Sequence, residues 1–272
     1  MRMFKYLLIF ILFISLGVST WIYYPQYQIH KIKKQAIKVN ADTSKVSYLD
    51  YFRHSKVSAI YNLAIGDSVI RGVGAKQNEN LVYQFSNKLE KQTHKRIQFK
   101  NEGINGITSS ELKDMVLDGR FDEEIKKADI VTVNVGGNDV LRMAKNKDFQ
   151  TVIQSYDQLQ STFSKNLSSI AARIYKVNPN ATLVFLELYN PLSTSEKLYS
   201  IAEKLLPNWN LKIYEVANQY ASSVVVETTK VINGDHLQNL SPDGVHPNSS
   251  GYLAISDQII YQLKKQYRKK AV

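Results

Sequence analysis

Three residue types that together can cleave an ester occur in two stretches far apart in the chain. Ser68 follows the short apolar run Leu63–Ile65 in the stretch YNLAIGDSVIRGVGA, and SPDGVHPNSSGY near the C-terminus places Asp243 three residues before His246. Serine is a poor nucleophile at neutral pH unless a base takes its proton. On a tight turn, the Asp243 carboxylate can hold one imidazole nitrogen of His246 while the other nitrogen faces Ser68.

The choice of base among the five histidines favours His246. Its competitor is His236, which follows Asp235 in a stretch with less regular patterning just ahead of the Asp243 motif. Pro247 stiffens the chain directly after His246, and a helix is predicted from about Ser249. The other three histidines lie away from the predicted site, namely His30, His54 and His94.

Acyl transfer also needs hydrogen-bond donors for the developing oxyanion, and losing one donor typically costs about 10²–10³-fold in rate. The Ser68 backbone N–H is one candidate. Gly106 is a second, because a residue without Cβ lets its amide approach a substrate closely, and Gly103 is the alternative to it. The side-chain amide of Asn138 is a third. The neighbouring Asp139 is interpreted as a turn or helix-cap residue without a chemical role.

Elements that could position these residues alternate along the chain from residue 57 onward. Short β-branched runs predict strands at Asn62–Ile65, Ile97–Asn101, Ile130–Asn134, Thr182–Leu186 and Val224–Glu227. Helical periodicity predicts helices near Glu79–Lys91, Phe121–Lys127, Thr151–Val177, Ser195–Tyr220 and Ser249–Lys265. This alternation with apolar strands indicates a parallel sheet covered on both faces, that is, a three-layer α/β/α domain with about five strands.

In such sheets, chemistry occurs on loops at the carboxyl ends of the strands. Polar, glycine-rich turns follow four of the predicted strands: GDS after the first, NEGINGITSSEL after the second, VGGNDVLR after the third and SPDGVHPNSSGY after the last. Each turn alone is weak evidence, since Gly and Asn commonly form turns. Together they predict that Ser68, Gly106, Asn138 and His246 share one edge of the sheet.

The bulk composition limits the function classes. The chain has 272 residues, enough for one sizeable core, and no cysteine, which excludes disulfides, thiolate metal sites and a cysteine nucleophile. The formal net charge of +11 favours anionic partners such as acidic lipid or a cell-wall polymer. The basic residues gather near the two ends without interleaved aromatics, which disfavours nucleic acid. Gly72 and Gly74 do not complete a dinucleotide-binding fingerprint, so no cofactor is expected.

The N-terminus predicts a membrane anchor. Arg2 and Lys5 precede an uncharged, mostly apolar run of 19 residues from Tyr6 to Tyr24, which is long enough to cross a bilayer. A cleaved signal peptide is the alternative, but the run ends in bulky aromatics of the interfacial kind. The predicted organisation is therefore an anchor over residues 1–24, a basic linker over residues 25–56 and one domain over residues 57–272.

The motifs resemble the four signature blocks of the SGNH, or GDSL-type, hydrolases, in the family's order and over the region from about Asn62 to the C-terminus. The matching segments are Gly66-Asp67-Ser68, GINGITS with Gly106, Gly136-Gly137-Asn138-Asp139 and Asp243-Gly-Val-His246-Pro247. One departure is Val69, where the family's name-giving motif has Leu. The resemblance implies a flavodoxin-like fold and ester hydrolysis without a metal. It also implies Ser68 as nucleophile, His246 as base, Asp243 orienting it, and an oxyanion hole of Ser68, Gly106 and Asn138.

The resemblance also implies a catalytic domain outside the cytoplasmic membrane, or a secreted one if the anchor is cleaved. The expected substrates are esters of a lipid, a lysophospholipid or an acetylated glycan. Apolar residues of the segment 187–210 could line an acyl pocket or form the buried face of a helix. The alternative function is a non-catalytic binding module of the envelope or cell wall, and a third is a scaffold for an anionic wall polymer.

Overall fold

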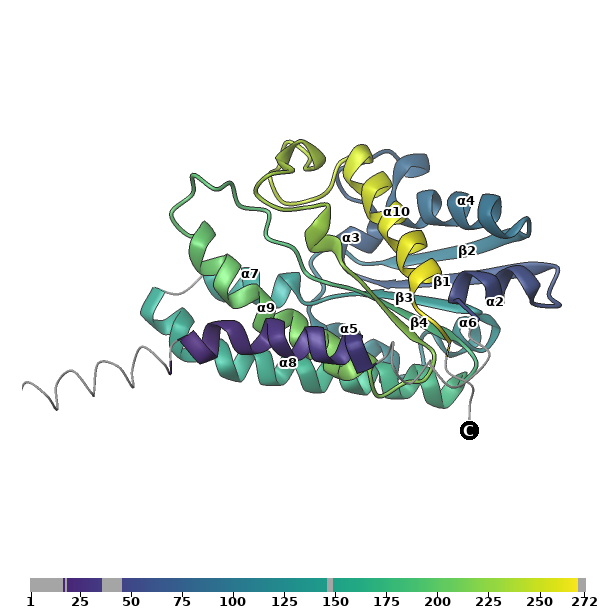
Figure 1. Cartoon of the computed structure of the whole chain (residues 1–272), viewed down its shortest axis with the longest axis horizontal. Helices are drawn as coiled ribbons and strands as arrows, with labels where there is room; N and C mark the ends of the chain where they lie inside the picture. The colour runs from purple at the N-terminus through teal and green to yellow at the C-terminus, as the bar shows by residue number, and fades with distance from the viewer. Residues whose placement is uncertain (1–16, 18, 36–45, 146–148, 269–272) are drawn as a thin grey trace, which may run out of the picture.

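The computed structural model describes residues 17, 19–35, 46–145 and 149–268 (Figure 1). Most of the predicted anchor, residues 1–16 and 18, lies outside this part of the chain. Within the described residues, no helix has the length and apolar character needed to cross a membrane.

The centre of the fold is a sheet of five parallel strands in the order β2-β1-β3-β4-β5. Side chains of β1 alternate between two cores, with Leu63 and Ile65 in one and Ile60 and Ala64 in the other. This alternation buries both faces of the sheet, as the near-continuous apolar strands predict. The strands are β1 (Ala59–Gly66), β2 (Arg96–Gly103), β3 (Ile130–Asn134), β4 (Thr182–Leu186) and β5 (Ser223–Val226).

Helices cover both faces of the sheet and complete the predicted three-layer α/β architecture (Figure 1). The first core is closed by α5 (Ser109–Leu117), α6 (Asp122–Lys127), α8 (Phe149–Val177) and α9 (Tyr199–Ala217). The second is closed by α2 (Tyr48–His54), α3 (Ser68–Arg71), α4 (Leu81–Thr93) and α10 (Ser249–Lys265). The described residues also form α7 (Gly137–Lys145), a helix over residues 19–35 and three short 3₁₀ turns at Gln77–Glu79, Thr228–Lys230 and Leu237–Asn239.

The predicted elements agree with the structure where the pattern is long or strongly apolar. The bounds of β3, β4 and α10 are as predicted, and the other strands differ by one to three residues at their ends. The sequence patterns did not predict α2, α3, α5 or α7. Each has nine residues or fewer and shows only a weak helical repeat, although the six-residue α6 was predicted.

The segment 25–56, predicted to be a linker, packs against the domain at both of its ends. Residues 19–35 form one continuous helix, in which Ile29 and Ile32 pack against the first core. Residues 36–45 lie outside the described part of the chain.

The second end of that segment is α2, whose apolar side chains are buried in the second core. Tyr48, Leu49 and Phe52 are each at most 2% exposed. Ser47 caps the helix and pairs in an antiparallel bridge with Tyr267, near the end of the chain. The folded domain therefore begins before residue 57, because burying three large apolar side chains fixes α2 to the sheet layer.

Candidate active site

Ser68 lies two residues after the end of β1, at the first position of α3. Asp67 caps this short helix, because its Oδ1 accepts a hydrogen bond of 2.9 Å from the Val69 N–H. The preceding Gly66 has a φ of +150°, and a Cβ there would stand 2.0 Å from the carbonyl oxygen of Asn134. A glycine is required here because β1 and β3 approach each other so closely. The tight turn that it permits exposes Ser68 at the carboxyl edge.

His246 connects Ser68 to Asp243 in one hydrogen-bonded series. Its Nε2 lies 2.7 Å from Ser68 Oγ, and its Nδ1 lies 2.7 Å from Asp243 Oδ2. The second carboxylate oxygen, Asp243 Oδ1, accepts hydrogen bonds from the N–H groups of Val245 and His246 and from Ser241 Oγ. Partial burial opposes ionisation, yet these hydrogen bonds and the His246 contact hold the pKa of Asp243 well below its usual value. The carboxylate thus stays charged beside the imidazole.

The turn that carries His246 is braced from several sides. The N–H of Ser241 donates to the His246 carbonyl over 2.7 Å, and the buried hydroxyl of Tyr189 donates to the Val245 carbonyl over 2.9 Å. Asn248 then caps α10 by accepting from the Gly251 N–H. Asp243 and His246 are three residues apart on this turn. The bracing therefore fixes the distance and orientation of the two side chains relative to each other.

Asp67 is a buried carboxyl group beside the nucleophile for which the sequence indicated no role. Its Oδ1 accepts from the Val69 N–H and, over 3.0 Å, from Asn134 Nδ2. Burial raises the pKa of Asp67 to about 6, although these two hydrogen bonds and nearby His246 lower it in part. The sequence feature that could have indicated a role for Asp67 is Asn134, a polar residue at the end of a predicted strand that would lie beside the glycine turn.

Gly106 lies on the turn after β2 and Asn138 lies at the start of α7, and hydrogen bonds join these two segments to each other and the turn to the end of β1. The Ile104 N–H donates to the Gly66 carbonyl over 2.8 Å, and Asn138 Nδ2 donates to the Ile107 carbonyl over 3.0 Å. Gly106 has a φ of +74°, and the position of its absent Cβ is open space. One hydrogen of the Asn138 amide remains for a substrate.

The backbone amides distinguish Gly106 from its alternative, Gly103. The Gly103 N–H donates to Asn101 Oδ1 over 2.9 Å and is therefore engaged inside the protein. Within the described part of the chain, the N–H groups of Ser68 and Gly106 have no protein acceptor. For Ser68 this follows from its place in the first turn of a helix, where N–H groups lack intrahelical partners.

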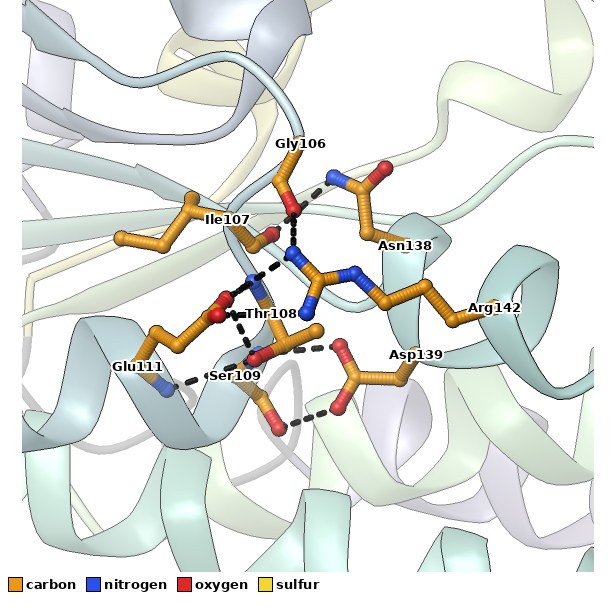
Figure 2. A network of polar contacts seen from close by, with 8 residues as sticks. All are labelled: Gly106, Ile107, Thr108, Ser109, Glu111, Asn138, Asp139 and Arg142. Atoms are coloured by element: carbon orange, nitrogen blue, oxygen red, sulfur yellow. Dashed lines mark hydrogen bonds and ion pairs between the residues drawn. The ribbon is translucent and has the colours of Figure 1, made fainter.

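The turn of Gly106 is held by a polar network from α7 and α5 (Figure 2). Arg142 Nη2 donates to the Gly106 carbonyl over 2.6 Å, and Arg142 Nη1 pairs with Glu111 Oε1 at 3.1 Å. Glu111 also forms a capping box with Thr108 at the start of α5. Arg142 therefore connects the turn to both helices.

Asp139 contributes a second tie in the same network (Figure 2). It was predicted to be a turn or cap residue, and it does cap a helix, but a neighbouring one. Its carboxylate accepts from the Ser109 N–H over 2.9 Å and from Ser109 Oγ over 2.6 Å, at the first turn of α5. Asn166 of α8 donates to the same Ser109 Oγ over 2.9 Å. Burial raises the pKa of Asp139, and the Ser109 hydrogen bonds oppose that rise.

The other candidates lie elsewhere. His236 Nδ1 lies 2.9 Å from Asn233 Oδ1, and His236 takes no part in the Ser68 hydrogen-bond series. In the segment 187–210, Trp209 is buried and stacks on Phe163 in the first core, whereas Leu198 is 56% exposed. Trp209 therefore belongs to the buried face of α9. No group of three or more His, Asp or Glu side chains within the described ranges is arranged to hold a metal ion.

The site consists of a serine, a histidine and an aspartate in hydrogen-bonded series at the carboxyl edge of a parallel sheet. This is the type of site found in serine hydrolases. Comparison with known proteins defines the class further. The GDSL-like Lipase/Acylhydrolase family matches residues 64–254, and the chain belongs to this family.

Relatives and solved structures agree with this family. The chain is 30% identical over 203 residues to the spore germination lipase LipC of Bacillus licheniformis, covering 72% of this chain and 92% of that protein. It is 24% identical over 207 residues to the uncharacterized protein YpmR of Bacillus subtilis, covering 75% of this chain and 81% of YpmR. Among solved structures, the lipase Lip_vut3 from a goat rumen metagenome superimposes with a TM-score of 0.67 at 26% identity. The match covers 75% of this chain and 97% of that chain.

Proposed function

We propose that the chain is a serine ester hydrolase that acts at the cell envelope, with Ser68 as nucleophile, His246 as base and Asp243 as the residue that orients the base. The observation that carries this proposal is the series of two hydrogen bonds, each 2.7 Å, from Ser68 Oγ through His246 to Asp243. Membership of a lipase/acylhydrolase family supports the reaction class.

The proposed reaction begins when His246 Nε2 takes the Ser68 proton and Oγ attacks the ester carbonyl carbon. Asp243 accepts a hydrogen bond from Nδ1–H, which keeps Nε2 free to accept the proton and stabilises the imidazolium that forms. The tetrahedral intermediate collapses as the alcohol leaves with the proton from His246. Water, deprotonated by His246, then attacks the acyl-enzyme and releases the carboxylic acid.

The oxyanion is held by three donors in this proposal: the N–H groups of Ser68 and Gly106 and the side-chain amide of Asn138. Among the described residues, the two N–H groups have no protein acceptor and one amide hydrogen of Asn138 is unused. Donors fixed before the reaction stabilise charge that develops only in the transition state, which is why they accelerate the step.

The proposed location is the outer face of the cell membrane, with an N-terminal single-pass anchor, or the secreted state if the anchor is cleaved. The support is the apolar run from Tyr6 to Tyr24 and its aromatic end. An ester of a lipid, a lysophospholipid or an acetylated glycan would be accessible there. The net charge of +11 supports an additional contact with an anionic wall polymer.

The test is turnover of p-nitrophenyl esters, from acetyl to dodecanoyl, by the full-length protein in detergent. Ser68→Ala is compared with Ser169→Ala, a serine of α8 outside the site. We expect loss of turnover and of labelling by a fluorophosphonate in Ser68→Ala alone. If both variants keep the wild-type rate, Ser68 is not the nucleophile. If folded wild type neither hydrolyses any ester nor reacts with the fluorophosphonate, the non-catalytic binding module becomes the better interpretation.

A further inference from the structure

We propose that the helix over residues 19–35 holds the domain with the carboxyl edge of the sheet facing the bilayer, and that the substrate is therefore an acyl ester of a membrane lipid. This inference rests on the proposed function and on the predicted anchor. It adds the orientation of the domain and selects one substrate class among the three open ones.

The helix is fixed to the domain through its second half. Lys33 Nζ pairs with Glu227 Oε1 at 2.5 Å and lies 5.0 Å from the centre of the Tyr214 ring. The side chains of Lys33 and Glu227 are only 35% and 14% exposed, so the pair is partly shielded from solvent. Ile29 and Ile32 pack beside it against the first core. A salt bridge next to apolar contacts fixes both the position and the rotation of the helix.

The helix runs beside α9 and in the same direction. A cavity of about 280 Å³ is lined by Gln26 and Ile29 of this helix and by Glu203 and Leu206 of the first half of α9; Lys33 and residues that follow β4 and β5 complete its lining. Lys33 lies further along, over Tyr214 in the second half of α9. Since α9 starts on the carboxyl side of the sheet, the helix over 19–35 starts on that side as well. Figure 1 shows its first, purple end on the side of α7 and of the loop after β4.

The start of this helix is the end of the apolar run in the sequence. The run from Tyr6 to Tyr24 overlaps the helix over residues 19–24, and the helix continues without a break into its docked half. Aromatic side chains at this end remain uncovered by the domain: Trp21 is 48%, Tyr23 68% and Tyr24 51% exposed. Exposed Trp and Tyr at the end of an apolar segment are typical of the membrane–water interface.

The continuity of the helix sets the height of the domain. Lys33 lies nine residues after Tyr24, which corresponds to about 14 Å along a helix at 1.5 Å per residue. Its partner Glu227 directly follows β5, at the carboxyl edge that also exposes Ser68. With Tyr24 at the interface and the helix along the bilayer normal, this edge faces the lipid headgroups from about 14 Å away, and a lipid acyl ester would reach Ser68 by rising partly out of the bilayer. In the reaction, the acyl–oxygen bond breaks, the fatty acid takes the oxygen of water, and the remaining lipid retains the ester's alcohol oxygen and gains a proton that originates from water.

The orientation can be measured because the chain contains no cysteine. Lys197→Cys, in the loop before α9 at the carboxyl edge, is compared with Lys127→Cys, at the end of α6 before β3 and thus at the amino edge. Both lysines are exposed. The full-length variants, labelled with a fluorophore, are reconstituted in phospholipid vesicles that carry a surface energy-transfer acceptor. We expect strong transfer from position 197 and weak transfer from position 127. Equal transfer, the reverse order, or failure to float with vesicles would overturn the proposal.

The substrate class is tested in the same vesicles with a fluorogenic phospholipid. Lys33→Glu should undock the helix and lower phospholipid hydrolysis by about fivefold or more, with the rate on soluble p-nitrophenyl butyrate unchanged. The control is Lys34→Glu, an exposed neighbour with the same charge change, which should leave both rates at wild-type values. If the wild type cleaves the soluble ester but not the phospholipid, the lipid assignment is refuted and the proposed esterase activity is not. Loss of both activities in wild type would instead refute the proposed function.

Discussion

Replacing Arg142 by alanine tests how firmly the turn of Gly106 must be held for turnover. The guanidinium donates to the Gly106 carbonyl over 2.6 Å and pairs with Glu111 at 3.1 Å. It makes no contact with the Ser68–His246–Asp243 series in the structure. The substitution therefore loosens one proposed oxyanion donor and leaves the nucleophile and the base in place.

The magnitude follows from the exposure of the two contacts. The side chains of Arg142 and Glu111 are 57% and 49% exposed, so their ion pair contributes little, about 0–1 kcal/mol. A hydrogen bond from a charged donor contributes about 1.5 kcal/mol at the lower end of its range. Since about 1.4 kcal/mol corresponds to a factor of ten, kcat should fall about tenfold. The fall stays below the roughly 10²–10³-fold expected for losing a donor outright, because Asp139 and Asn138 still hold the turn.

The assay is kcat and KM for a short p-nitrophenyl ester, with thermal unfolding measured on the same samples. Glu111→Gln is the control, because it removes the ion pair and leaves both the Gly106 hydrogen bond and the capping box available. We expect less than a threefold change in that control. An Arg142→Ala enzyme with unchanged kcat and raised KM would refute the reasoning, since Arg142 would then contact the substrate. A large drop in melting temperature that accounts for the lost activity would also refute it.

Three further predictions concern the carboxylates and the glycine at the nucleophile. Asp243→Asn should lower kcat on the order of 10³–10⁴-fold without unfolding, measured by ester turnover and circular dichroism, because an amide at Oδ2 favours the imidazole tautomer that cannot accept the Ser68 proton. Burial raises the pKa of Asp67 to about 6, so the folded state holds a proton that the unfolded state releases near pH 4. The wild-type free energy of unfolding should therefore fall as pH rises from about 4 to 6. At about 1.4 kcal/mol per pH unit, the stability gain of Asp67→Asn over wild type should grow by up to about 3 kcal/mol across this window, as measured by urea titration. A difference that does not change with pH would contradict the raised pKa of Asp67. Gly66→Ala should cost on the order of 4 kcal/mol or prevent folding, because its Cβ would stand 2.0 Å from the Asn134 carbonyl oxygen; a folded variant with near-wild-type urea midpoint would exclude this close approach.

The amino-acid sequence by itself determined the elements whose pattern is local. The buried strands β3 and β4 and the helix α10 have the predicted bounds, because runs of β-branched residues and a repeat of apolar residues every three or four positions are properties of neighbouring residues. The sequence also indicated Ser68, Asp243 and His246 as one set, because the carboxyl ends of parallel strands share an edge. The structure brings these three side chains into hydrogen-bond distance.

Only the tertiary structure decided which groups are free and which are engaged. The two glycines of the second block are alike in sequence, yet the Gly103 N–H is bound to Asn101 while that of Gly106 is not. Asp139 caps α5 and not its own helix, and Lys33, in a segment predicted to be a linker, pairs with Glu227. These partners are 30 and 194 residues apart. Such contacts depend on how helices pack across a sheet, and no local pattern of residues records that geometry.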